Sequence, residues 1–215
     1  MESVANLEGT MNNVATQLTV PEAAEARRSI RKYTPEQIPP DDIREILRLS
    51  GLAPTPFNVQ PARYVVVTDP ELKARLAQAA YQQPQVTSAP AVIVVYSDMA
   101  DALATLDEVV HPGYPVDQRA GAKAGIERGF SGKPAEENQA WGHAISYTNL
   151  GYLLLLAQSF GYSTSAMLGF QPDEVKRVLG LPAHVTIPAL VAIGRGDEAG
   201  FPHHRHPVDR VATFR

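Results

Sequence analysis

The chain of 215 residues contains no cysteine. Disulfide bridges, zinc–thiolate sites and thiol nucleophiles are therefore excluded, and a cysteine-free chain is typical of a reducing compartment. The first residues lack the basic and apolar regions of a secretory signal. The longest apolar run, within Gly151–Ala157, is too short to cross a bilayer. We therefore expect a cytoplasmic protein with no membrane partner.

Basic charge is scarce, because 19 lysines and arginines face 23 acidic residues and leave a net charge of −4. Whole-chain electrostatics therefore gives no support for a nucleic-acid partner. The hydrophobic fraction of 44% and the charged fraction of 20% are ordinary for a globular protein. Residues 1–18 are polar and weakly periodic, which predicts a mobile tail, and residues 19–215 are predicted to form one domain.

The stretch Arg27–Arg31 holds three arginines and a serine. A capping-box pattern at Thr19–Glu22 predicts a helix that begins near Val20, and Pro35 prevents that helix from running far beyond Arg28. An extended chain after the helix places alternate side chains of the stretch on one face. Two guanidinium groups and a hydroxyl on that face suit a dianionic phosphate. The alternative, which these five residues alone favour, is a solvated basic surface patch.

A proline-rich loop follows at Ala53–Pro61. Its three prolines predict an extended, rigid chain. The side-chain amides of Asn58 and Gln60 can each donate and accept hydrogen bonds, which suits the edge of a heterocycle. A structural turn in which Asn58 bonds its own backbone is the alternative.

The remaining periodicity predicts alternating strands and helices. The strand at 91–96 is apolar throughout, which indicates that both of its faces are covered. Strands are predicted at 63–68, 91–96, 162–167 and 188–194, and helices at 41–50, 70–81, 98–110, 117–128, 136–160 and 172–179.

Residues 111–134 form the least regular segment, with five glycines and three prolines. A glycine-rich excursion of this length is often a lid over a site, and a floppy surface insertion is the equally open alternative. The following helix contains Leu150–Ala157, which is apolar almost all round. Such a helix lies either in the centre of a core or in a subunit interface.

The C-terminal arm, residues 202–215, begins with three histidines and Arg205 between two prolines. A metal site is disfavoured because no acidic or sulfur ligand stands beside these histidines. An anion-binding role with Arg205 as the fixed charge fits better. Gly194–Gly196 is not a dinucleotide loop, because its third glycine is misplaced and no helix follows.

These motifs, in this order, resemble those of the nitroreductase family of FMN-dependent oxidoreductases. Arg27–Arg31 resembles the family's N-terminal arginine-x-serine-x-basic motif, and the loop Ala53–Pro61 resembles its proline-asparagine-glutamine loop. The apolar helix, Leu168–Phe170 and Pro202–Arg205 fall where the family places a core helix, a flavin N5 contact and a basic pair. The resemblance covers residues 25–215.

The resemblance implies an α+β fold of three layers, with helices on both sides of a central mixed, mainly antiparallel sheet. It also implies a homodimer with FMN at each of two interfaces, where Thr55, Pro56 and Asn58 reach the flavin bound by the other subunit. The segment Val208–Arg215 is expected to wrap the partner and add to its sheet edge. Within one subunit, the residues implied to hold FMN are Arg27, Arg28, Ser29, Arg31, Gln83 (or its neighbour Gln82), Leu168, Gly169 and Arg205.

The implied activity is transfer of electrons from NADH or NADPH to nitroaromatic, quinone or similar flat acceptors, by a ping-pong mechanism. FMN carries that chemistry, so no catalytic acid, base or metal is expected of the protein. Related alternatives are flavin destruction or dehalogenation, and a flavin-binding module without turnover. His203 departs from the family pattern, because it stands where lysine is frequent and so makes the local charge depend on pH. Pro56 stands where a hydroxyl is common, so that side-chain contact is lost.

Overall fold

Four strands form the centre of the fold in the computed structural model, which describes residues 17–215. Their bounds are β1 (Ala62–Val67), β2 (Ala91–Ser97), β3 (Ser163–Met167) and β4 (Thr186–Gly194). The spatial order is β1-β2-β4-β3, and every neighbouring pair of these strands is antiparallel. The sheet is therefore antiparallel, and the parallel pairing expected of a mixed sheet is limited in the described residues to an isolated bridge between Ser29 and Thr164 of β3.

The described helices begin mostly at a proline or directly after a capping side chain. They are α1 (Val20–Ala26), α2 (Pro40–Ser50), the 3-10 helix η1 (Pro56–Asn58), α3 (Pro70–Ala79), α4 (Pro84–Ser88), α5 (Met99–Ala104), α6 (Leu106–Val109), α7 (Val116–Phe130), α8 (Ala135–Ser159), α9 (Pro172–Leu179) and α10 (Val208–Val211).

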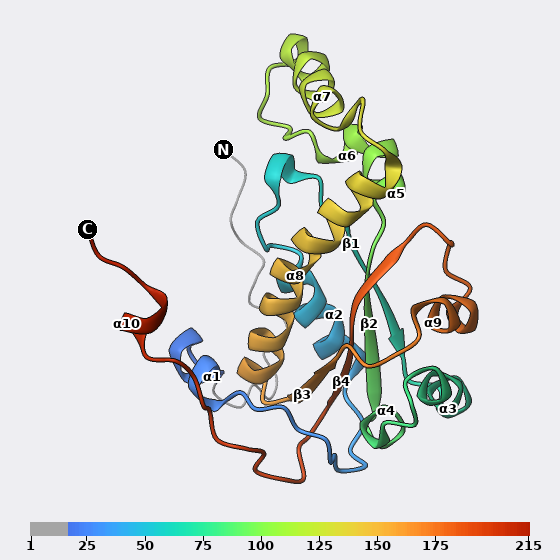
Figure 1. The fold of residues 1–215 in the computed structure, drawn as a ribbon, viewed down its shortest axis with the longest axis vertical. Helices are drawn as coiled ribbons and strands as arrows, with labels where there is room; N and C mark the ends of the chain where they lie inside the picture. Colours follow the sequence, from blue (N-terminus) through green and yellow to red (C-terminus); the bar gives the residue numbers. More distant parts are fainter. Residues whose placement is uncertain (1–16) are drawn as a thin grey trace, which may run out of the picture.

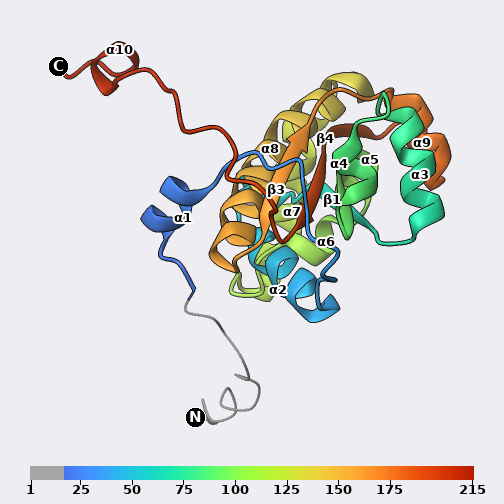
Figure 2. The same cartoon turned by 90° about the horizontal axis from the view of Figure 1, so that it is seen from below.

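Helices cover both faces of the sheet (Figures 1 and 2). The helices α2 and α8 pack on one face, and α3, α4 and α9 pack on the other. Two separate apolar clusters result, one on each side, and β2 and β4 contribute side chains to both. The continuous apolar run of β2 is buried for this reason, and the predicted α+β fold of three layers is confirmed.

Several helices begin at the capping residues that the sequence contains. Thr19 caps α1 with the reciprocal capping-box bonds to Glu22, and Asp69 caps α3 through Leu72 N. The predicted helix at 98–110 is instead two short helices, α5 and α6, which meet at Thr105. The helix α4 was not predicted, and it begins at Pro84, where a proline suits the first turn.

The prediction of an extended chain through Ala53–Pro61 was wrong. Residues 56–58 form η1, and Phe57, Asn58 and Gln60 have φ angles of +56°, +56° and +49°. Proline fixes its own φ but not that of the residues between prolines. The left-handed turn is held by a bond from Asn58 Nδ2 to Val109 O, at 2.9 Å, which connects it to the end of α6.

The apolar helix α8 is not buried on every side within one chain. Leu150, Leu153 and Ala157 are buried, whereas Gly151 and Tyr152 are exposed. The predicted mobile tail lies outside the described residues except for residues 17 and 18, and the Leu18 N–H donates to the carbonyl of Ser159. Within the described residues, no helix is both long and apolar enough to cross a membrane.

Candidate functional site

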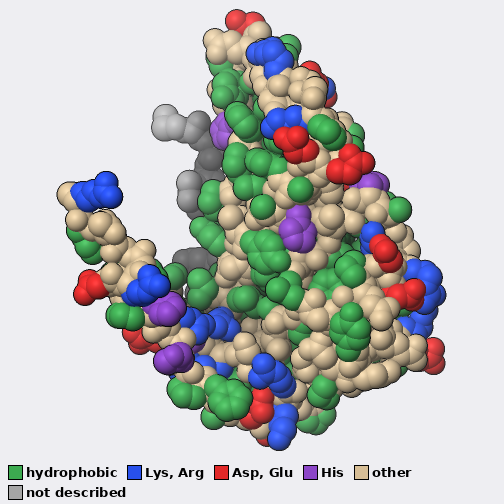
Figure 3. Space-filling view, viewed as in Figure 1, with side chains coloured by type: hydrophobic (Ala, Val, Ile, Leu, Met, Phe, Trp, Pro, Cys, Tyr) green, Lys and Arg blue, Asp and Glu red, His purple; other side chains and the backbone are tan. Residues whose placement is uncertain are grey.

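Three arginines gather where the C-terminal arm crosses the end of α1. Burial lowers the pKa of the Arg27 guanidinium, and the nearby charges of Arg205 and Arg28 lower it further. In residues 17–215, no carboxylate forms an ion pair with any of these three side chains. Figure 3 shows Lys, Arg and His side chains together in this region. Like charges held together without a counter-charge form a receptor for an anion.

The arm reaches this place from the opposite end of the sequence. His203 Nε2 lies 3.3 Å from the carbonyl oxygen of Ala24 in α1, which fixes the start of the arm beside the arginines. The Arg28 guanidinium donates to the carbonyls of Glu25 and Arg27, at 2.6 and 2.9 Å. Arg28 therefore caps the C-terminal end of α1.

The segment after the arginines runs along the outer edge of β3. Ile30 N donates to Thr164 O at 3.0 Å, and the exposed Ser29 bridges the same residue. The backbone N–H of Arg31 donates to Glu198 Oε1 at 2.7 Å. These bonds hold Arg27, Ser29 and Arg31 in the extended course that the sequence predicted after α1.

Gln83 and Gly169 meet near the C-terminal end of β3. Gln83 Nε2 donates to Gly169 O at 2.6 Å, and Gln85 Nε2 donates to Gln83 Oε1 at 2.9 Å. Among the described residues, the N–H of Gly169 has no hydrogen-bond partner, and Leu168 beside it is 68% exposed. This backbone donor is therefore available to a ligand.

The two clusters are related by β3 itself. Five residue steps separate Thr164 from Gly169, or about 17 Å of extended chain. Basic side chains at one end and a free amide donor at the other fit a phosphorylated, flat heterocycle laid along the strand edge. The residues present therefore fit FMN. A cleft of about 750 Å³ adjoins them, lined by Arg31, Lys32, Tyr33, Pro84, Ser88, Asp197, Glu198, Gly200 and Phe201.

Thr55, Pro56 and Asn58 lie elsewhere in the same chain. Figure 1 shows the segment after α2 near α6 and α7, at the other end of the molecule from α1. Phe57 and Asn58 of this segment line a separate cavity of about 380 Å³ with residues of α7 and the segment before it. A single chain therefore places the arginines and the Gln83–Gly169 pair at the two ends of one strand edge, but does not bring the Thr55–Asn58 loop to them.

The sequence did not separate Gln82 from Gln83, and it gave Gln85 no role. Gln82 has a φ of +56° and Tyr81 one of +53°, so the chain turns sharply before Gln83. That turn points the Gln83 amide at Gly169. Residues held at positive φ cluster at functional sites because the surrounding structure must hold them there.

Replacing Gln83 with leucine is expected to weaken cofactor binding about tenfold, because the Gly169 carbonyl loses a bond of about 0.5–1.5 kcal/mol and its peptide loses its orientation. Titration of the cofactor-free protein with FMN measures the effect. Gln82→Leu is the matched control, because the side-chain amide of Gln82 forms no hydrogen bond within the described residues. Equal affinity in the two variants would contradict this role of Gln83.

The sequence model of the Nitroreductase family matches residues 24–195. An NADH dehydrogenase of Thermus thermophilus is 48% identical over 193 residues, which cover 90% of this chain and 94% of that protein. A Bacillus subtilis protein, YdgI, named as an NAD(P)H nitroreductase, is 33% identical and covers 90% of this chain and 96% of its own length.

A solved structure from Exiguobacterium sibiricum, described as a nitroreductase in complex with FMN, has the same fold. Its TM-score is 0.86 with 30% sequence identity, over 94% of this chain and all of that one.

Proposed function

Because the chain belongs to the nitroreductase family, we propose that this FMN-dependent NAD(P)H oxidoreductase reduces nitroaromatic, quinone or similar flat acceptors by a ping-pong mechanism. The observation that carries the proposal is that two groups lie along one strand edge: arginines that form no ion pair within residues 17–215, and the Gly169 N–H, which has no hydrogen-bond partner there. When bound, FMN supplies the redox chemistry by taking a hydride from NADH or NADPH and passing electrons to the acceptor. A reducing cytoplasm is the expected location.

The protein's part begins at the phosphate. Arg27 and Arg205 provide the charge, Ser29 and Arg31 lie on the extended segment beside them, and Arg28 holds the end of α1 in place. Guanidinium groups bind phosphate through paired N–H donors, which fixes orientation as well as affinity. Because the arginines repel one another in the free protein, an anion relieves that repulsion when it binds.

At the other end, the Gly169 N–H would donate to the flavin N5, and Leu168 would cover the adjacent ring surface. Gln83 holds the Gly169 peptide in place through its hydrogen bond to the Gly169 carbonyl oxygen. A Cβ on Gly169 would lie 3.3 Å from Gln83 Nε2, so a side chain there would press on that amide. No titratable side chain of the protein is assigned a proton transfer in this scheme.

A functional test starts from FMN-loaded protein under anaerobic conditions, with menadione and a nitroarene as acceptors. Turnover well above that of free FMN, with parallel double-reciprocal lines, is the expected result. Rates equal to those of free FMN would indicate that the protein binds flavin without catalysing turnover. Loss of flavin absorbance that requires oxygen would indicate flavin destruction instead.

We also propose that the enzyme is a homodimer in which the Thr55–Asn58 loop of each subunit reaches the flavin of the other. In one chain this loop lies far from the segment between β3 and α9, and α8 leaves Tyr147 and Tyr152 41% and 43% exposed. A second copy over that face would bury them, and an obligate interface buries more than about 2,000 Å².

Dilution below the dimer dissociation constant is therefore expected to release FMN and to destabilise the fold together, because each monomer holds only half of each site. Sedimentation equilibrium and flavin fluorescence, measured across the same concentration series, check the coupling. A folded monomer that keeps its FMN would contradict the dimeric site.

A further inference from the structure

A chain of hydrogen-bonded amides ends at the N–H of Gly169. Gln85 Nε2 donates to Gln83 Oε1 at 2.9 Å, and Gln83 Nε2 donates to the carbonyl oxygen of Gly169 at 2.6 Å. The peptide that contains this carbonyl also contains the N–H of Phe170, which donates to the carbonyl oxygen of Leu168 at 3.1 Å. The Leu168 carbonyl belongs in turn to the peptide that carries the Gly169 N–H. Two side-chain amides and two peptides are therefore connected in series.

The order of donors and acceptors along this chain strengthens its last donor. Each amide after the first accepts at its oxygen and donates at its nitrogen, so each bond increases the polarity of the next. Hydrogen bonds connected in this way are stronger than isolated ones. The Gly169 N–H is the last donor, and it has no partner within residues 17–215. An acceptor atom of a ligand placed before it therefore meets a stronger donor than an isolated peptide would provide.

The first amide of the chain is held rigidly. Gln85 lies in α4 and is only 3% exposed. The end of this helix is attached to α3, because Nζ of the buried Lys73 donates to the carbonyl oxygen of Ala89 at 2.6 Å. Val86 and Ala89 are fully buried in the apolar cluster on that face of the sheet. The side chain of Gln85 is therefore fixed by its surroundings.

The fixed amide of Gln85 decides how the amide of Gln83 is oriented. The oxygen and the nitrogen of a glutamine amide have nearly the same shape, so either can be turned toward a neighbour. In the reversed orientation, Gln83 Oε1 would face the carbonyl oxygen of Gly169, and Gln83 Nε2 would face Gln85 Nε2. Two acceptors would then repel at one end and two donors at the other. Gln85 thus excludes the orientation in which the Gly169 carbonyl loses its donor.

We propose that Gln85 is a positioning residue for the flavin reaction, which orients and strengthens the Gly169 N–H toward N5 of FMN without touching the cofactor. The inference rests on the proposed function, in which this N–H donates to N5. A firmly held donor at that atom fixes the position of the flavin ring, and so the place at which NADH and the acceptor meet it.

A flavin analogue that lacks the acceptor atom tests this role. In 5-deaza-FMN a C–H group replaces N5, so the Gly169 N–H has no acceptor. The wild-type protein is expected to bind FMN about fivefold more tightly than 5-deaza-FMN, which is the size of one neutral hydrogen bond. In Gln85→Leu we expect this preference to fall below about twofold, because the chain loses its first donor and the Gln83 amide can reverse. Titration of the cofactor-free, full-length protein with each flavin measures the dissociation constants.

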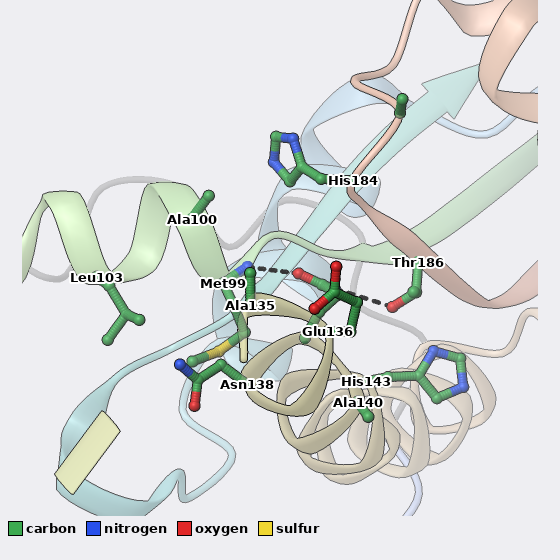
Figure 4. A pocket seen from close by; sticks show the side chains of 12 residues that line it. Met99, Ala100, Leu103, Ala135, Glu136, Asn138, Ala140, His143, His184 and Thr186 are labelled. Carbon is green, nitrogen blue, oxygen red and sulfur yellow. Dashed lines mark hydrogen bonds between the residues drawn. The ribbon is translucent and has the colours of Figure 1, made fainter. Parts of the chain in front are cut away.

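Gln139→Leu is the matched control for the loss of a buried glutamine. Gln139 lies in α8 and is 8% exposed. Its side-chain amide bonds to Met99 N, Ser97 O and Thr186 Oγ1. These bonds lie beside a separate cavity of about 640 Å³, and Figure 4 draws those to Met99 and Thr186 as dashed lines. This variant is expected to lose stability and to keep the preference for FMN, because the chain of amides stays intact.

The preference ratio separates positioning from a general loss of structure. If Gln85→Leu weakens the binding of both flavins by the same factor, its preference equals that of the wild type and the inference is overturned. An equal fall of the preference in Gln85→Leu and Gln139→Leu would overturn it as well. Failure of the wild-type protein to bind either flavin would contradict the proposed function instead.

A second measurement needs no substitution, so it decides the matter even if Gln85→Leu does not fold. Nuclear magnetic resonance with isotope-labelled glutamine follows the side-chain amide protons of Gln85 in wild-type protein loaded with FMN or with 5-deaza-FMN. Their chemical shifts are expected to differ between the two complexes, because polarisation is transmitted along the chain. The side-chain amide protons of Gln139 are expected to have the same shifts in both. Identical shifts at Gln85 in the two complexes would overturn the inference.

Discussion

Replacing Arg27 with alanine is expected to lower the affinity for FMN at least tenfold. Hydrogen bonds to charged groups contribute about 1.5–3 kcal/mol each, and tenfold corresponds to about 1.4 kcal/mol. Arg27 is half-buried beside Arg205 and Arg28, so its charge acts on a bound phosphate with less screening than a surface arginine would. Titration of the cofactor-free protein with FMN, followed by flavin fluorescence, measures the loss.

The same variant separates a binding defect from a folding defect. Removing one of several like charges should leave the cofactor-free protein at least as stable as the wild type. Arg44→Ala is the control, because Arg44 pairs with Asp41 on the surface of α2 and both side chains are mostly exposed. If FMN affinity is the same in both variants, the phosphate binds at another place.

The largest expected loss of stability comes from Gly142→Ala, where α8 crosses α5 and β2. The added Cβ would lie 2.6 Å from Met99 Sδ and 2.8 Å from Ser97 Oγ. Met99 is 2% exposed and Ser97 is fully buried, so the added methyl group must be accommodated by shifts of packed side chains or of the α8 backbone. Overpacking of this kind costs about 1–3 kcal/mol. Urea unfolding at a fixed protein concentration measures the free-energy change.

Gly121→Ala in α7 is the same chemical change, but we expect it to raise the stability of the protein. No heavy atom lies within 4 Å of the Cβ position at Gly121, so the alanine meets no obstacle. Alanine in a helix interior is favoured over glycine by about 0.8–1.0 kcal/mol. A loss of stability in both variants would show that crowding is not what requires glycine at position 142.

The sequence predicted the elements well where the signals are local. The helix at 172–179 was placed with its observed bounds, since Pro172 starts it and Gly180, at φ +66°, ends it. The helix at 136–160 was placed within one residue at each end. Proline at the first turn and glycine after the last turn act within a few residues, so the helix ends that they set can be predicted from the sequence alone.

The errors arose where distant residues decide the backbone. The left-handed η1 depends on a bond from Asn58 to Val109, 51 residues away in sequence. The choice between Gln82 and Gln83 depends on Gly169, 86 residues beyond Gln83. Adjacent identical side chains differ only in direction, and that direction is set by contacts that the sequence does not display.

The candidate site also has one part that a local motif predicted and one part that depends on distant residues. The arginines of the phosphate end follow from a short motif, and the chain places Arg205 beside them. The opposing loop at Thr55–Asn58 was carried over by resemblance, and a single chain leaves it far away.

The long-range contacts beside β3 also determine when the cofactor site can form during synthesis of the chain. Residues near 30 pair with Thr164, Tyr33 pairs with Gly196, and His203 returns to α1. Synthesis proceeds from the N-terminus, and closing such long loops costs entropy before any contact offsets it. A nascent chain thus holds Arg27 long before the arm that joins it exists. Flavin colour, on this reasoning, appears only once nearly the whole chain has left the ribosome.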